Sequence, residues 1–251
     1  MFDLSVSEAR RLGFALQAHA LTMAGDTTRP ILASVLVEPC DAGFTVTSTD
    51  SYVCLHTQHF VEGRSDTWQL AGSFRLAPNP NGTKPANVVR DLGKALATCG
   101  LPVRLTVDGD RLHFGVSERD ELVHLPVDVA EANDFPMYRQ LFAAASVRKV
   151  PVPDPDTGEV PELNRGVVAG AFIVMRIAKV QALAVKAAKG GNAGEVLLVM
   201  EPNGTGLGPV PFFFTVANED HGRERWNGIF MPVRYDFASD REYLIPAVSH
   251  V

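Results

Sequence analysis

The chain has 251 residues, 46% of them hydrophobic and 21% charged, with a formal net charge of −6 and a sequence pI near 5.6. This composition is ordinary for a globular protein with ample core, in one large domain or two of ordinary size, and its acidity argues against simple wrapping of nucleic acid. No apolar run approaches the ~20 residues of a membrane span, the N-terminus lacks a signal-peptide pattern, and three cysteines without metal-ligand spacing indicate reduced cytoplasmic thiols.

The N-terminal part predicts a strand, a helix and then three strands. A short alternating run opens the chain, and Ser7 followed by Glu8 is typical of a helix start. The helix is expected to reach about Thr22, with Leu12 and His19 among the residues on its apolar side. The three strands, divided at turn-forming residues, are expected at Ile31–Glu38, Gly43–Thr49 and Tyr52–Phe60.

The same order then recurs. Ser73–Leu76 predicts a strand, and Pro85 to Thr98 predicts a helix, because proline suits the first turn of a helix. Asp108-Gly109 is a strong hairpin signal within the strands that follow. Those strands are expected at Val103–Val107, Arg111–Ser117 and Glu121–Val127.

A third copy is expected near the C-terminus. Four prolines between Ala143 and Asn164 disfavour regular structure and indicate a linker. The third copy would contain a strand at Val167–Ala171, a helix before Gly190, and strands at Glu195–Glu201, Pro211–Val216 and Trp226–Val233. Repetition of one unit predicts an α+β architecture of β-α-β-β-β units. The expected division is 1–140 with two units, a proline-rich linker at 141–165, and a shortened domain at 166–251.

Positive charge is segregated onto the third expected helix. From Leu163 to Gly194 there is no Asp or Glu, although the whole chain is acidic. At roughly 100° per residue, the basic residues share a little over a third of the helix circumference. They are Arg176, Lys179, Lys186 and Lys189, and the apolar residues on another side are Ile177, Val180, Ala184 and Ala187. The basic side is either an ordinary solvated surface or a surface for the phosphates of a polyanion.

The other two helices show the same bias, with Arg10 and Arg11 on the first and Lys84, Arg90 and Lys94 at the second. In this context several segments resemble the bacterial β sliding clamp, the processivity ring of DNA polymerase III. They are RPILASVLVE (Arg29–Glu38), GFTVTSTDSYVCLHT (Gly43–Thr57), the segment DFP (Asp134–Pro136) after the last strand expected in the second unit, and Met231-Pro232-Val233-Arg234. The resemblance covers about 1–140 and 166–235.

The resemblance implies a DNA-clamp fold with helices on the inner face of a ring and antiparallel sheets outside. Double-stranded DNA would pass through the ring without sequence readout, held by basic side chains. The implied DNA-binding residues are Arg10, Arg11, Arg29, Arg90, Lys94, Arg176, Lys179, Lys186 and Lys189. The implied peptide-binding pocket, for polymerase and clamp-loader subunits, contains Met231, Pro232, Val233 and Arg234. Met231 and Val233 could equally be alternate residues of a core strand.

The implied protein is not an enzyme and needs no cofactor. A ring of twelve such units would require four copies of a three-unit chain, or three copies if a fourth unit is hidden. The short chain suits a bacteriophage replication protein in the cytoplasm of a bacterium or an infected cell.

Two other interpretations are open. A metal- or thiol-dependent enzyme could use Glu219-Asp220-His221, Cys99 or His124, although the acidic triplet lies in an expected hairpin turn. A clamp-fold interaction module could instead bind replication proteins without encircling DNA.

Overall fold

A computed structural model describes most of the predicted elements. It covers residues 2–25, 28–40, 43–61, 74–78, 84–108, 111–116, 119–131, 135–140, 142, 171–187, 197–198, 210–218 and 222–230. The described strands form one 11-stranded sheet in which every neighbouring pair is antiparallel. Across these residues, no helix combines the length and apolarity that crossing a membrane requires.

Three consecutive groups of elements follow the predicted order. Unit 1 comprises β1 (Phe2–Leu4), α1 (Val6–Thr22), β2 (Val35–Cys40), β3 (Gly43–Thr49) and β4 (Val53–Phe60). Unit 2 comprises β5 (Phe74–Pro78), α2 (Pro85–Thr98), β6 (Val103–Asp108), β7 (Arg111–Val116) and β8 (Arg119–Glu131). Unit 3 comprises α4 (Ala171–Ala187), β9 (Leu197–Leu198), β10 (Val210–Asn218) and β11 (Gly222–Phe230).

The α1 helix begins one residue earlier than its sequence predicts, at Val6. Ser5, not Ser7, is the N-cap: its backbone N–H donates to Glu8 Oε2 at 2.7 Å, and Glu8 N–H donates to Ser5 Oγ at 3.3 Å. This reciprocal capping box satisfies two backbone donors that the first turn leaves without helical partners. The bounds of α2 agree with its prediction, and Pro85 stands at its start.

Strand boundaries differ where local turns override the apolar pattern. β2 begins at Val35 because Arg29 O accepts from the N–H groups of Leu32 and Ala33 at 3.0 and 3.1 Å, which turns the chain there. β8 continues to Glu131, past its predicted end. The predicted strand at Val167–Ala171 falls almost wholly, and the linker at 141–165 mostly, outside the described residues, so the domain boundaries stay a prediction.

Units 1 and 2 exchange strands. β1 of unit 1 pairs with β6 of unit 2, and β5 of unit 2 pairs with β2 of unit 1. Unit 3 joins the other side of unit 1, where β11 pairs with β4, the last strand of one unit against the last strand of the other. The sheet order is therefore β1-β6-β7-β8-β5-β2-β3-β4-β11-β10-β9.

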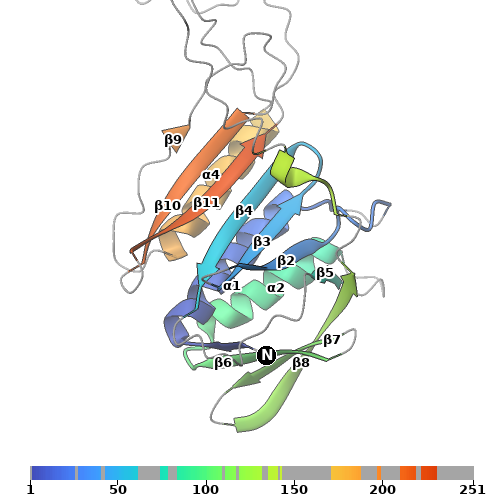
Figure 1. Cartoon of the computed structure of the whole chain (residues 1–251), viewed down its shortest axis with the longest axis vertical. Coiled ribbons are helices and arrows are strands. Elements are labelled where there is room, and N and C mark those ends of the chain that lie inside the picture. Colours follow the sequence, from blue (N-terminus) through green and yellow to red (C-terminus); the bar gives the residue numbers. More distant parts are fainter. Residues whose placement is uncertain are drawn as a thin grey trace, which may run out of the picture.

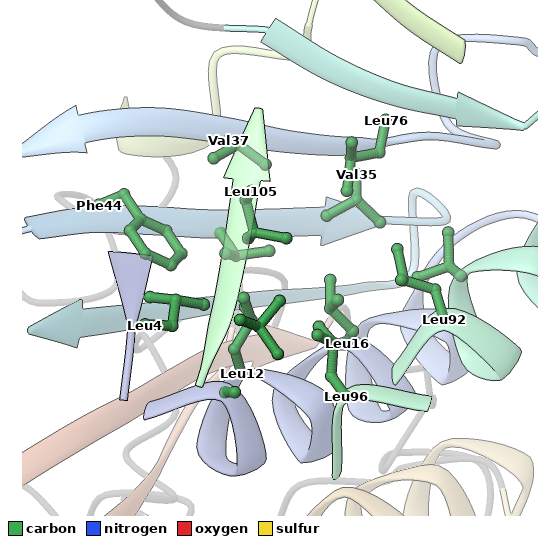
Figure 2. Close-up of a cluster of buried hydrophobic side chains, with 14 of the residues drawn as sticks. Leu4, Leu12, Leu16, Val35, Val37, Phe44, Leu76, Leu92, Leu96 and Leu105 are labelled. Atoms are coloured by element: carbon green, nitrogen blue, oxygen red, sulfur yellow. The ribbon is translucent and has the colours of Figure 1, made fainter. Parts of the chain in front are cut away.

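The main core lies between the sheet and the α1–α2 pair. Leu12 and Leu16 of α1 and Leu92 and Leu96 of α2 meet side chains from the strands, among them Val35 (Figure 2). A second cluster links unit 1 to unit 3 through Ile177 and Val180 of α4, Leu55 of β4, and Trp226 of β11, which is fully buried. Burial of this kind supplies most of the stabilisation of a domain.

Candidate nucleic-acid interface and peptide pocket

The three helices lie side by side with α1 in the centre. α1 packs against α2 on one flank and against α4 on the other (Figure 1). The close approach of α1 and α2 depends on two glycines: a Cβ at Gly13 would lie 2.5 Å from Ala97 N, and a Cβ at Gly93 would lie 2.5 Å from Gly13 O. The sheet covers one side of this row, so basic side chains on the other side face solvent together.

Two lysines of α4 occupy that solvent side. Lys179 and Lys186 are exposed, whereas Ile177 and Val180 are buried in the cluster with Trp226. At roughly 100° per residue, Lys186 lies half a turn from Ile177, so it points away from the sheet. Within the described part of the chain neither lysine has an ion-pair partner. Lys189 lies outside the described residues.

On α2 the predicted cations are exposed but share an acid. Lys94 Nζ lies 3.2 Å and Arg90 Nε lies 3.6 Å from Asp91 Oδ1, and all three side chains are about half exposed. Exposed pairs of this kind are weak and screened by salt. The two cations remain free to exchange Asp91 for a phosphate, with one positive charge in excess.

Arg10 connects the central helix to α4. Its guanidinium lies 5.0 Å from the centre of the Phe14 ring, and Nη1 donates to Ala187 O at the end of α4 at 3.4 Å. The side chain is only half-buried. Arg10 therefore contributes positive charge between the two helices while helping to hold them together.

The structure corrects the prediction that Arg11 binds DNA. Its side chain is only 6% exposed, because it points from α1 toward the sheet. Its charge, together with burial, helps to lower the pKa of the buried His59 imidazole to about 3. A buried guanidinium cannot meet a phosphate on the solvent side, so Arg11 is excluded from the surface.

Arg176 is engaged within the fold. Its Nη1 donates to Asp50 Oδ2, and its guanidinium stacks 3.9 Å from the centre of the Phe172 ring. Asp50 Oδ1 also accepts from the N–H groups of Tyr52 and Val53, each at 2.9 Å. Arg176 thus ties α4 to the β3–β4 turn, a role that the sequence pattern does not indicate.

Arg29 lies beside that same turn and not on a helix. It is exposed, and Nη1 donates to Ser51 Oγ at 3.3 Å. Ser51 has φ +81°, a left-handed conformation that fixes the turn tightly. Arg29 therefore sits at the rim of the pocket formed by the turn.

The pocket has a volume of about 250 Å³ and lies between units 1 and 3. Its lining is mainly apolar and includes Leu32, Tyr52, Pro136, Tyr138, Ile229 and Phe230. Tyr52 is 59% exposed and forms part of the open side. Phe230 is the last of these lining residues in the sequence. Met231, Pro232, Val233 and Arg234 come next in the sequence and lie outside the described residues, so their place in the pocket stays a prediction.

One wall of the pocket is held by Tyr138. Its hydroxyl donates to Glu38 Oε2, and Arg139 Nη2 donates to Glu38 Oε1 at 3.1 Å. Burial and the bond to Glu38 raise the pKa of Tyr138. The Tyr138 ring packs with Cys54 and Ile229, which alternate along their strands with residues that face the helices, so this wall lies on the opposite face of the sheet.

Most pocket residues were not singled out from the sequence. Two segments that supply pocket residues, Asp134–Pro136 and Gly43–Thr57, nevertheless belong to the motifs that carry the resemblance, so the sequence did indicate them. What the sequence does not reveal is that β11 pairs with β4, which brings Ile229 beside Cys54. That pairing creates the pocket.

The described residues contain no group of three or more His, Cys, Asp or Glu side chains that could hold a metal ion. Burial raises the pKa of the Cys54 thiol to about 12, which leaves it unreactive at neutral pH. Glu219, Asp220 and His221 lie outside the described residues.

The repeated units, the helices side by side and the joined antiparallel sheet define an α+β protein with the DNA-clamp fold. Its particular likeness is to bacterial DNA polymerase III β subunits. The Pseudomonas aeruginosa DnaN sliding clamp bound to griselimycin matches with a TM-score of 0.54 at 16% identity, over 98% of this chain and 67% of that one. Caulobacter crescentus pol III beta matches with 0.53 at 17% identity, over 98% and 69%.

The Thermotoga maritima DNA polymerase III β subunit matches with a TM-score of 0.51 at 12% identity, over 98% of this chain and 67% of that one. The chain therefore spans about two thirds of the length of these proteins. No protein-family model matches the chain, and no curated protein matches it in sequence. At these identities the likeness establishes the fold.

Proposed function

We propose that the protein is a sliding clamp that holds duplex DNA without sequence readout and tethers replication proteins to it. The observation that carries this proposal is the row of α2, α1 and α4 on one side of the sheet with exposed cations on its solvent side. The proposed surface comprises Arg10, Arg90, Lys94, Lys179 and Lys186. Lys189 is included by its sequence position.

The charge distribution supports loose retention of DNA. The protein as a whole carries a net charge of −6, so DNA is repelled by most of its surface and attracted by the helix row. Cations that meet phosphates, without side chains that read base edges, give affinity without a preferred sequence. Such a surface permits movement along the duplex.

The pocket supports the tethering role. It is apolar, open at Tyr52, and bordered by the exposed Arg29. A short peptide with one or two large apolar side chains from a polymerase or clamp-loader subunit would fit this volume, with Met231 to Arg234 extending the site. The pocket wall formed by Tyr138 faces away from the helix row, so both ligands can be held at once.

Encirclement requires more than one copy of the chain, and we propose a homo-oligomeric ring. The row of three helices supplies only part of a closed wall around a duplex. No enzymatic activity is proposed. An interaction module that binds peptides but not DNA is the second candidate, and the same experiment separates the two.

The test measures binding of a fluorescent 30-base-pair duplex to the full chain by anisotropy at low salt. Neutralising Lys179 and Lys186 together to Gln is expected to weaken binding at least about tenfold, because each lost phosphate contact costs affinity directly. Arg104→Gln is the control: Arg104 is half exposed on β6 between the buried Val103 and Leu105, so it faces away from the helices.

Equal effects of the lysine double variant and Arg104→Gln would contradict the proposed surface. A chain that binds apolar peptides while showing no measurable duplex affinity would be the interaction module instead.

A further inference from the structure

One wall of the pocket is formed by a segment that lies outside the three units. Pro136 and Tyr138 belong to residues 135–140, which we call the strap and which follow the last strand of unit 2 in the sequence. The other described lining residues come from unit 1 and from β11 of unit 3. The strap is not a strand of the sheet, so the hydrogen-bond ladder that holds β4 beside β11 does not hold it. The pocket therefore depends on how the side chains of the strap are docked.

Tyr138 anchors the strap on the face of the sheet opposite the helices. It is only 6% exposed, and its ring centre lies 5.5 Å from that of His56. His56 is itself held in place, with Nδ1 2.8 Å from Thr47 Oγ1. The apolar residues packed with Tyr138 come from β2, β4 and β11 and are Leu36, Cys54 and Ile229. This one side chain thus connects the strap to units 1 and 3 together.

Pro136 depends on the same anchor. The Tyr138 N–H donates to Pro136 O at 2.6 Å, which closes a tight turn between the two residues. Met137, between them, is 71% exposed and points away from the sheet. A displacement of Tyr138 therefore moves Pro136 as well, and both lining residues of the strap leave the pocket together.

Glu38 is the polar partner of this anchor, although it does not line the pocket. It lies on β2, and its side chain is 14% exposed. The Tyr138 hydroxyl donates to Glu38 Oε2, Arg139 Nη2 donates to Glu38 Oε1 at 3.1 Å, and Arg139 Nε donates to the hydroxyl at 3.3 Å. A guanidinium has only donors, so Arg139 cannot replace Glu38 as acceptor. A buried hydroxyl without its acceptor is costly, and the phenol then gains by turning toward water.

We propose that Glu38 is a positioning residue of the peptide pocket, which acts through the Tyr138 hydroxyl to keep the strap docked and the pocket wall in place. The inference rests on the proposed peptide-binding function for what the pocket holds. The strap exchanges between a docked and an undocked state, and a peptide that needs the wall binds with an affinity reduced in proportion to the docked fraction.

Cys54 provides a reporter of docking. It is 2% exposed beside Tyr138, and burial raises the pKa of its thiol to about 12, so it reacts slowly while the strap is docked. Replacing Cys40 and Cys99 by Ser leaves Cys54 as the single thiol of the full chain. The rate of labelling with a maleimide then follows the undocked fraction.

Glu38→Ala should raise the labelling rate at least about tenfold and weaken binding of the fluorescent peptide Gly-Leu-Gly-Phe-Gly at least about threefold, because it leaves a buried hydroxyl unpaired. Glu38→Gln keeps an acceptor and should stay within about twofold of the unmodified chain in both measurements. Adding Tyr138→Phe to Glu38→Ala removes the unpaired hydroxyl and should restore both values. Asp3→Ala is the control, since it removes an exposed carboxylate that pairs with Arg104 at the β1–β6 edge.

Repeating the labelling in low concentrations of urea separates the strap from global unfolding. Undocking of the strap exposes little surface, so the rate should hardly change, whereas labelling through global unfolding rises steeply with urea. A steep rise for Glu38→Ala, or a labelling rate equal to that of Asp3→Ala, overturns the proposal. So does a peptide affinity that stays unchanged while labelling is faster, or a Glu38→Ala defect that Tyr138→Phe does not repair. If the unmodified chain binds no peptide, the proposed tethering function fails, and the labelling rates alone decide whether Glu38 holds the strap.

Discussion

His19 lies at the centre of a buried chain of side-chain hydrogen bonds in unit 1. Its Nδ1 lies 2.8 Å from Ser48 Oγ and its Nε2 lies 2.9 Å from Thr57 Oγ1. Thr57 Oγ1 in turn lies 2.9 Å from His59 Nε2. Hydroxyls can donate or accept, so two neutral imidazoles can be satisfied here without burying charge. The network holds α1 on β3 and β4.

This network predicts loss of stability in acid. Burial, above all, lowers the pKa values of His19 and His59, the latter to about 3, so the unfolded chain binds more protons than the folded one below the usual histidine pKa of 6.5. Stability is therefore full above pH 6.5 and falls as the pH drops below it. His59 alone should cost about 2 kcal/mol between pH 7 and pH 5. Urea denaturation at the two pH values measures this loss.

His59→Gln keeps a polar partner for Thr57 but does not titrate, and it should flatten the pH dependence. A free energy of unfolding that is constant or rises from pH 7 to pH 5 would disprove the role given to the buried imidazoles.

Asp50 joins the β3–β4 turn, which lines the pocket, to α4 of unit 3. Its carboxylate is nearly buried, caps the turn at Tyr52 and Val53, and pairs with Arg176. Asp50→Ala should destabilise the protein by about 2–4 kcal/mol, because it leaves a largely buried guanidinium and two N–H groups without their acceptor. Thermal or urea unfolding measures the change.

Asp91→Ala is the matched control for Asp50. Asp91 also contacts cations, but its side chain is 61% exposed, so its loss should change stability by less than about 0.5 kcal/mol. Equal effects at the two positions would show that the Asp50 contacts contribute little.

Single residues show why the predicted charged set was only partly correct. Arg10 and Arg11 are consecutive residues of one helix, yet Arg11 is buried toward the sheet and Arg10 reaches α4. Which side of a helix is covered depends on neighbours that are distant in sequence. The acceptor for Arg176 is likewise supplied by a turn far away in the chain, so no local pattern reveals it.

At the scale of elements, α1 and α2 approach each other closely at Gly13 and Gly93. Gly13→Ala would place a Cβ 2.5 Å from Ala97 N and 2.6 Å from Gly93 O, both backbone atoms that cannot swing aside. The helices would have to separate, and the cost should be about 2–4 kcal/mol. Chemical denaturation with circular dichroism measures this value.

Gly25→Ala is the control, because a Cβ there would meet nothing within 4 Å. It should leave stability within about 0.5 kcal/mol of the unmodified chain. If Gly13→Ala were as mild as Gly25→Ala, the crossing would be looser than the structure has it.

Elements with strong local signals were predicted well. α2 has a proline start and an apolar periodicity, and β3 lies between two clear turns, so their bounds agree with the sequence pattern. β2 was predicted four residues too early, since the apolar residues near Leu32 fold into turns stabilised by Arg29 O. Apolar character alone does not separate a strand from a buried turn.

At the scale of the whole molecule, the sequence indicates the repeated units but does not indicate which strands of different units pair. The order of strands and helices within each unit indicates the clamp architecture, and the similar solved structures confirm the fold. The exchange of β1 and β5 between units, and the joining of β4 to β11, depend on contacts between distant segments. These pairings place the helices in a row and create the pocket.

The two proposed ligands should respond differently to salt, which provides a test of the whole arrangement. Duplex affinity rests on the helix row and should fall steeply with salt, with a slope in a logarithmic plot of roughly −0.9 per phosphate neutralised. Affinity for an apolar peptide rests on the pocket between units 1 and 3 and should change little, because burial of apolar surface does not depend on ion release.

Lys186→Gln should reduce the duplex slope by about one and leave peptide affinity unchanged. Tyr52→Ala, at the exposed side of the pocket, should weaken peptide binding several-fold and leave the duplex slope unchanged. Anisotropy titrations from 50 to 300 mM salt measure all four quantities, and a duplex slope that Tyr52→Ala alters as much as Lys186→Gln would mean that the two surfaces are not separate.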